Sequence, residues 1–322
     1  MIGRKQRGSG AFPLLFTMIF IGIEDKNMLF TNKEKGNFAK DPAVVKFNGI
    51  YYLYYSIMLP GNKFGVGIAS STDMEQWENI GEVPLEEEYE KNGIAAPGAI
   101  VLQDEVHLFY QTYGNWREDA ICHAVSKDGV HFVKNASNPV FSPSKEWCCG
   151  RAIDADVCIF NEKLYLYFAT RDEEMKIQKV GGACAELNSG FGKGTWTELT
   201  FHTLLEPELP WEGECIEAPA TLVRNGKIYM FYGGSYNCTP QQIGCAVSED
   251  GVEFRRIFAE PLVKCGASDA WNSSESGHPY VFEDEDGSVV LFYQGSADMG
   301  NTWYLSRLDI VFDKDGNPSV AE

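Results

Sequence analysis

Short apolar runs rich in tyrosine and phenylalanine recur along the chain between turns that contain glycine, asparagine or aspartate. There are five such runs, which begin at Tyr51 (YYLYY), Val106 (VHLFY), Leu164 (LYLYF), Ile228 (IYMFY) and Val289 (VVLFY). Their spacing of about 55 to 64 residues indicates an internal repeat. No window keeps an apolar period of 3.6 residues, so the pattern predicts strands rather than helices.

Each repeat contains the strands of one small antiparallel sheet. In the first repeat an inner strand (PAVVKF) is followed by an Asn48-Gly49 turn, the Tyr-rich strand and a third strand of small residues (FGVGIASS). Three repeats close with an outer edge, which begins at Ser71, Ser126 or Ser248. Four short strands repeated five times predict an all-β, five-bladed β-propeller in a single domain. We expect this domain to span residues 31–322, after an N-terminal extension of residues 1–30.

Ionisable residues precede most of the Tyr-rich strands by ten or eleven positions. The residues at this offset are Asp41, Ala96, Asp154, Glu217 and His278. In a propeller the first residues of the innermost strands surround one end of the central channel, so we expect the three carboxylates to share a pocket. Hydrolysis of a glycosidic bond needs one carboxylic acid and one carboxylate on opposite sides of that bond. A third carboxylate nearby raises the pKa of the acid. The pattern therefore predicts a glycoside hydrolase.

Four segments resemble the blade starts of glycoside hydrolase family 43. They are KDPAVVKFNGIYYLYYS, RAIDADVCIFNEKLYLYFATRD, IEAPATLVRNGKIYMFYGGS and SGHPYVFEDEDGSVVLFY, and the likeness runs from about Ala39 to Ile310. The resemblance implies an inverting enzyme that removes arabinofuranosyl or xylosyl units, with Asp41 as general base, Glu217 as general acid and Asp154 tuning the acid. It also implies that no cofactor is required, although His278 would face the central channel near a structural calcium ion or a water.

The sequence departs from the family pattern at two places. Asp154 is followed by Ala155 instead of proline, and Asp156, two residues further along the strand, is an alternative for the tuning position. Glu214 precedes a cysteine, as does the acid of the related fructan hydrolases of family 32, although Glu217 fits the repeat offset better. The alternatives are therefore a retaining, fructosidase-like hydrolase and a non-catalytic, carbohydrate-binding propeller.

Substrate contacts are expected from loops at the same end of the channel as the acids. Aromatic faces suit sugar rings, while Arg and Asn suit sugar hydroxyls. The candidates are Trp116, Arg117, Trp147, Arg151, Arg171, Tyr236, Asn237 and His278. By contrast, aromatic residues in the outer turns are expected to pack between blades, namely Trp77, Trp196, Phe132 and Phe254.

The net charge limits the classes of partner that we expect, and the cysteine content bears on the cellular location. A formal net charge of -19 argues against nucleic acids and anionic membranes, so we expect a neutral oligosaccharide or polysaccharide. Nine cysteines without paired C-x-x-C spacing favour buried, reduced thiols and a cytoplasmic location. The alternative is a secreted or periplasmic protein, because basic residues and the stretch AFPLLFTMIFIGI from Ala11 resemble a signal peptide, although no cleavage site follows.

Overall fold

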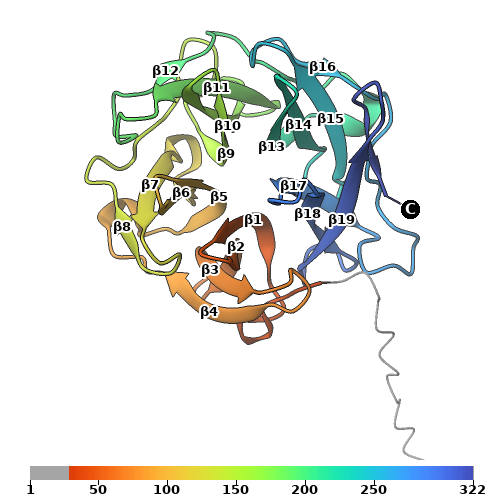
Figure 1. The fold of residues 1–322 in the computed structure, drawn as a ribbon, viewed down its shortest axis with the longest axis horizontal. Coiled ribbons are helices and arrows are strands. Elements are labelled where there is room, and N and C mark those ends of the chain that lie inside the picture. Colours follow the sequence, from red (N-terminus) through yellow and green to blue (C-terminus); the bar gives the residue numbers. More distant parts are fainter. Residues whose placement is uncertain (1–28, 322) are drawn as a thin grey trace, which may run out of the picture.

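The five repeats form the five blades of a β-propeller. The computed structural model describes residues 29–321, and Figure 1 shows five antiparallel sheets arranged around a central axis. Each sheet has four strands that follow one another in sequence from the axis outward. The predicted fold class is therefore confirmed, while most of the N-terminal extension, with its signal-like stretch, lies outside the described residues.

The strands have the following bounds. Blade 1 contains β1 (Lys40–Phe47), β2 (Ile50–Leu59), β3 (Lys63–Ser71) and β4 (Glu78–Val83). Blade 2 contains β5 (Ile94–Leu102), β6 (Glu105–Thr112), β7 (Ile121–Ser126) and β8 (Phe132–Lys134). Blade 3 contains β9 (Ile153–Phe160), β10 (Lys163–Arg171), β11 (Gln178–Glu186) and β12 (Thr197–Glu198). Blade 4 contains β13 (Ile216–Arg224), β14 (Lys227–Gly234), β15 (Gln242–Ser248) and β16 (Arg255–Arg256). Blade 5 contains β17 (Glu275–Glu283), β18 (Val289–Ser296), β19 (Tyr304–Phe312) and β20 (Pro318–Val320).

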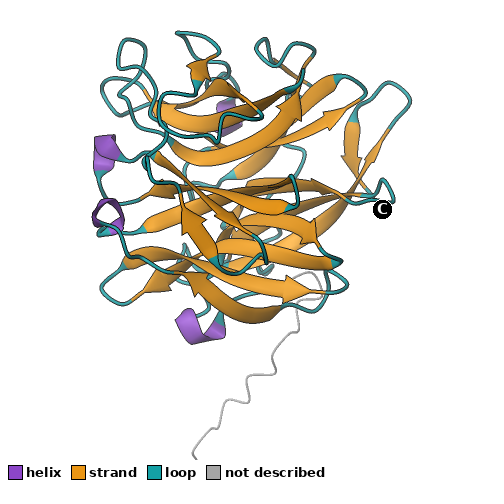
Figure 2. Cartoon of the chain, turned by 60° about the vertical axis from the view of Figure 1, so that its left-hand side comes forward, coloured by secondary structure: helices purple, strands orange, loops and turns teal. Residues whose placement is uncertain are grey.

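Helical structure is limited to short 3₁₀ turns in the loops, which Figure 2 shows beside the strands. In the described part of the chain these are η1 (Lys33–Lys35), η2 (Glu88–Glu90), η3 (Trp116–Glu118) and η4 (Pro210–Glu212). Over residues 29–321 no helix is long and apolar enough to cross a membrane.

Aromatic residues of the outer turns pack against the Tyr-rich strand of a neighbouring blade, as the sequence predicts. Phe132 of blade 2 contacts the Tyr54 ring of blade 1 edge-on, with centroids 5.5 Å apart. The hydroxyl of Tyr54 also donates to the carbonyl oxygen of Gly129 at 2.8 Å. Gly129 has φ +78°, and an added Cβ would lie 2.9 Å from the Tyr52 ring, so only glycine fits. Phe254 packs on the neighbouring blade 3 in the same way.

Every innermost strand has a β-bulge close to its start. In each blade the pairing with the second strand shifts by one residue, which leaves one residue with positive φ at the bulge. The bulge residues have φ between 43° and 53° and are Asp41, Ala96, Asp154, Ala218 and His278. The bulge residues of blades 1, 3 and 5, which are Asp41, Asp154 and His278, line a common cavity at one end of the channel.

Candidate active site

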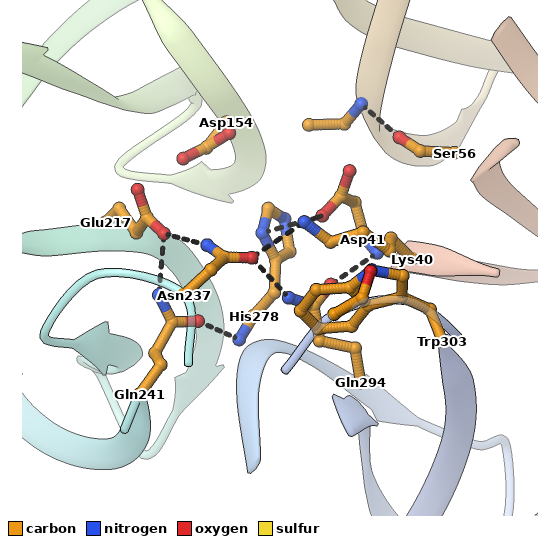
Figure 3. A network of polar contacts seen from close by, with 12 residues as sticks. Lys40, Asp41, Ser56, Asp154, Glu217, Asn237, Gln241, His278, Gln294 and Trp303 are labelled. Atoms are coloured by element: carbon orange, nitrogen blue, oxygen red, sulfur yellow. Dashed lines mark hydrogen bonds and ion pairs between the residues drawn. The ribbon is translucent and has the colours of Figure 1, made fainter. Parts of the chain in front are cut away.

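The bulges of the innermost strands line a cavity of about 280 Å³ at one end of the channel. Asp41, Asp154 and Glu217 all lie in its wall, and Figure 3 shows their carboxyl groups around a common space. All three side chains are buried. Carboxylates from blades 1, 3 and 4, far apart in sequence, therefore meet at one place.

Asp41 is held as an ionised carboxylate. Its backbone N–H donates to Oε1 of Gln294 in blade 5 at 3.0 Å, and its Oδ1 lies 3.1 Å from Nδ1 of His278. Burial raises the pKa of Asp41, but His278, Lys40 and the Ser56 hydroxyl together lower it by more than burial raises it. The pKa of Asp41 therefore lies below its ordinary value. Burial lowers the pKa of His278 by more than the charges of Asp41 and Glu217 raise it.

Glu217 lies one residue before the bulge of its blade. The bulge residue of blade 4 is Ala218, and Glu217 is the last paired residue before it, opposite Gly233. The proline that follows the bulge residue in four blades follows Ala218 in blade 4, so Glu217 stands one position earlier than Asp41 and Asp154 do in their blades. Glu217 still faces the cavity, since the residue before each bulge also reaches the channel wall in four of the blades.

Three side-chain amides donate hydrogen bonds to Glu217. Oε1 accepts from Nε2 of Gln241 at 2.6 Å and from Nδ2 of Asn237 at 3.2 Å. Oε2 accepts from Nε2 of Gln178. A carboxylate oxygen has two acceptor positions, so both positions of Oε1 are filled. The buried thiol of Cys215 is a further hydrogen-bond partner of the Glu217 carboxylate.

Asp154 faces the same cavity with a different environment. Its backbone N–H donates to Oε1 of Gln111 at 2.6 Å, but no described residue donates a hydrogen bond to its carboxylate. Burial, and then the charges of Glu217 and Asp41, raise the pKa of Asp154 well above its ordinary value, which favours the protonated form.

Asp156 and Glu214, the two alternative carboxylates, do not line the cavity. The bulge at residues 154–155 breaks the alternation of the strand, so Asp156 turns to blade 4, where its Oδ2 accepts from the backbone N–H of Thr221 at 2.7 Å. The expectation that Asp154 and Asp156 face the same side was wrong for this reason. Glu214 is exposed, in the loop before β13.

Five of the candidate substrate-binding residues line the cavity and three do not. The five that do are Arg151, Arg171, Tyr236, Asn237 and His278. Trp116 is 66% exposed in η3, and Arg117 next to it donates to the carbonyl oxygen of Glu173. Trp147 packs under blade 3, where its indole N–H donates to Glu198 at 2.8 Å. None of these three residues lines the cavity.

Arg151 and Lys40 are the cations that sit deepest in the wall. Arg151 binds the buried Asp119 through Nε at 3.2 Å and Nη2 at 3.1 Å. Lys40 lies 4.3 Å from the centre of the Trp303 ring and donates to Oδ1 of Asn237 at 2.7 Å. Burial lowers the pKa of Lys40, but the surrounding carboxylates, Asp41 first, raise it more, so it stays charged.

Several residues of the site were not among the predicted ones. They are Lys40, Phe64, Gln111, Tyr113, Gln178, Gln241 and Gln294. Two of them carry a repeat signal, because Gln111 and Gln294 each follow directly after a Tyr-rich run and each bind the bulge N–H of the next blade. Gln241 has no such signal. Blade 4 has Gly233 at the corresponding position, and an added Cβ there would lie 2.9 Å from Oε1 of Gln241, so the glycine leaves room for that amide.

A calcium ion near His278 remains a prediction. Within residues 29–321 no three His, Cys, Asp or Glu side chains come together in a way that could hold a metal ion. His278 contacts one carboxylate, that of Asp41. The residues present do not form a metal-ligand set, so the proposed mechanism involves no metal.

The cysteines all lie in the described part of the chain and are free thiols. The cytoplasmic location also stays a prediction.

Comparison with known proteins identifies a family. The sequence model of glycosyl hydrolases family 43 matches residues 31–317. A search of curated proteins finds no match. A solved thermostable family-43 glycoside hydrolase is 24% identical with a TM-score of 0.72, over 88% of this chain and 93% of its own. An endo-1,4-beta-xylanase from Bacteroides thetaiotaomicron is 22% identical with a TM-score of 0.71, over 93% and 96%. An alpha-L-arabinofuranosidase from Lactobacillus brevis is 16% identical with a TM-score of 0.65, over 90% and 97%. At these identities the structural likeness concerns the fold.

Proposed function

This chain belongs to glycosyl hydrolases family 43 and is a glycosidase, and we propose that it removes arabinofuranosyl or xylosyl units with inversion of configuration. Asp41 is the general base, Glu217 the general acid and Asp154 the residue that tunes the acid. The observation that carries this proposal is the meeting of these three buried carboxyl groups in one cavity, each with a different set of partners.

Asp41 suits the base because its carboxylate stays ionised. With its pKa below the ordinary value, Asp41 can accept a proton from a water at neutral pH. His278 holds Oδ1 by a hydrogen bond at 3.1 Å, and the backbone hydrogen bond to Gln294 fixes the bulge that carries the side chain. The water that attacks the anomeric carbon then loses its proton to Asp41 as the bond to the sugar forms.

Glu217 suits the acid because its two carboxylate oxygens have different sets of partners. Gln241 and Asn237 fill both acceptor positions of Oε1, whereas Gln178 fills one of Oε2. The proton that goes to the leaving oxygen is therefore carried by Oε2. As the glycosidic bond breaks, this proton moves to the leaving oxygen and Glu217 becomes a carboxylate that the three amides stabilise.

Asp154 is a second carboxyl beside the acid. Burial, and then the charges of Glu217 and Asp41, raise its pKa well above the ordinary value, so this carboxyl holds a proton more tightly than an ordinary aspartate does. Asp154 receives no hydrogen bond from the described residues, which leaves its carboxyl free to contact a sugar hydroxyl.

The size and the lining of the cavity also favour a small, neutral sugar unit as the bound part of the substrate. Its volume of about 280 Å³ lies at the low end for ligand sites, which favours a single terminal unit. Phe64, Tyr113 and Tyr236 line it and offer aromatic faces to the apolar side of a sugar ring.

The test is turnover of nitrophenyl arabinofuranoside and xyloside by the wild type and by two matched variants, Glu217→Gln and Glu214→Gln. Glu217→Gln should lower kcat by roughly 100-fold or more, because the amide cannot supply the proton. Glu214→Gln should retain wild-type turnover, since Glu214 is exposed outside the cavity. Full activity of Glu217→Gln on a substrate with a poor leaving group would refute the assignment.

A further inference from the structure

The side-chain amide of Asn237 has only one orientation available. Its Oδ1 lies 2.7 Å from Nζ of Lys40, and an ammonium group can only donate. Nε2 of Gln294 approaches the same oxygen at 3.4 Å. Gln294 is itself oriented, because its Oε1 accepts the backbone N–H of Asp41. Nδ2 of Asn237 must therefore face Glu217, as Figure 3 shows.

The amide of Gln178 is oriented in the same manner by a second cation. Nε of Arg171 donates to Oε1 of Gln178 at 2.7 Å, so Nε2 of Gln178 faces Glu217. The guanidinium is held in place by the carbonyl oxygen of Met175 at 3.3 Å and by the ring of Tyr236, 5.2 Å away.

The third amide is oriented by the backbone. Oε1 of Gln241 accepts the N–H of His278 at 2.9 Å, which turns Nε2 toward Glu217. All three amides thus present N–H groups to Glu217 and none presents an oxygen. Two of the three orientations depend on the cationic side chains of Lys40 and Arg171.

This arrangement matters most when Glu217 is protonated. A free amide can rotate and offer its oxygen to the proton of a carboxylic acid, which would draw that proton away from the substrate. An amide whose oxygen already binds a cation cannot do so. The proton on Oε2 then has the leaving oxygen of the substrate as its acceptor.

We propose that Lys40 and Arg171 are positioning residues for acid catalysis, which keep the amides of Asn237 and Gln178 turned with their N–H groups toward Glu217. The inference rests on the proposed role of Glu217 as the acid. Neither cation touches the reacting atoms in this scheme, and each acts through the amide it binds.

Lys40 also has an electrostatic effect that the test must separate. It faces the carboxylates of Asp41, Glu275 and Glu217 and the phenol of Tyr113. Asp41 in addition faces His278 and the Ser56 hydroxyl, and Asp154 faces Arg151. Removing the Lys40 charge therefore moves the acidic limb of the pH profile to higher pH, because Asp41 loses one of the charges that lower its pKa. This effect changes the base and applies equally to all leaving groups.

The experiment compares leaving groups. The substrates are aryl glycosides of the sugar that the wild type cleaves, and their leaving groups range from dinitrophenyl, the best, to methyl-substituted phenyl, the poorest. The variants Lys40→Met and Arg171→Met are each assayed on this series at their own pH optimum. We expect kcat/KM to fall roughly 10- to 100-fold for the poorest leaving group and less than about 3-fold for dinitrophenyl, which needs little acid assistance. Lys227→Met is the matched control, because Lys227 pairs with Glu249 at the far end of blade 4 and should change neither value.

The outcomes separate the two proposals. Equal losses on all leaving groups, or no loss in a folded variant, would overturn the positioning role. If Lys40→Met does not fold, Arg171→Met decides the question, since Arg171 is only half-buried. If Glu217→Gln retains full activity on the poorest leaving group, the proposed function itself fails. If Glu217→Gln is inactive while both cation variants match the wild type, only the positioning role fails.

Discussion

Lys40 and Glu217 occupy the same position in two different blades. Each is the last paired residue before the bulge of its innermost strand, opposite Ser56 in blade 1 and Gly233 in blade 4. Asn237 bridges them, with Oδ1 accepting from Lys40 at 2.7 Å and Nδ2 donating to Glu217 at 3.2 Å. The propeller therefore supplies two rings of side chains to the cavity, one from the bulges and one from the residues before them.

The stereochemistry of the product should be inverted. An inverting enzyme places a water between the base and the anomeric carbon, and we assign that base to Asp41. Proton NMR of the sugar released in the first minutes should show the anomer opposite to that of the substrate. An initial product with the same anomeric configuration would favour the retaining alternative.

Replacement of Asp154 by Asn should move the alkaline limb of the pH profile to lower pH. Burial, and then the charges of Glu217 and Asp41, raise the pKa of Asp154, so Asp154 holds its proton to a higher pH than an ordinary aspartate does. Asn cannot hold that proton, so the variant lacks the group that keeps a proton in the site as the pH rises. Profiles of kcat/KM from pH 4 to 9 should show this, and an unmoved or raised alkaline limb would contradict the tuning role.

Replacement of Asp156 by Asn should stabilise the protein at pH 8 and have little effect at pH 4. Burial raises the pKa of Asp156 from 3.8 to about 7. The folded state binds the Asp156 proton more tightly than the unfolded state does. The contribution of this proton to the free energy of unfolding is therefore fully present below pH 4 and is lost as the pH rises through 7. Asn keeps an acceptor for Thr221 without the charge, so this decline should disappear. Thermal unfolding at several pH values measures it, and activity should persist because Asp156 lies outside the cavity.

Replacement of Asp119 by Ala should destabilise the fold. Asp119 is 1% exposed and binds Arg151 through two hydrogen bonds, so its loss leaves a buried guanidinium without its carboxylate. Such a change costs about 3–5 kcal/mol in the free energy of unfolding, which urea denaturation measures. The exposed ion pair of Glu118 and Lys145 provides the control, because Glu118→Ala should not change the midpoint of urea denaturation. Equal midpoints for the two variants would contradict the structural role of Asp119.

The sequence alone determined the architecture and identified the three carboxylates that line the cavity. The Tyr-rich runs recur with a regular spacing because each blade must bury the same apolar face, so a local pattern reveals the fold. Asp41 and Asp154 stand at the bulge residue in that pattern, and the proline after the bulge marks it in most blades.

The tertiary structure decided the register of Glu217, the separation of Asp154 from Asp156 and the identity of the amides around the acid. A bulge adds one residue without changing the apolar pattern, so an offset counted along the chain cannot locate it to a single residue. Gln178, the first residue of β11, and Gln241, in the loop before β15, both reach Glu217, and their position depends on how blades 3, 4 and 5 pack around the axis. Strand periodicity is a property of short segments, whereas a hydrogen-bond network across blades exists only when the whole ring has closed.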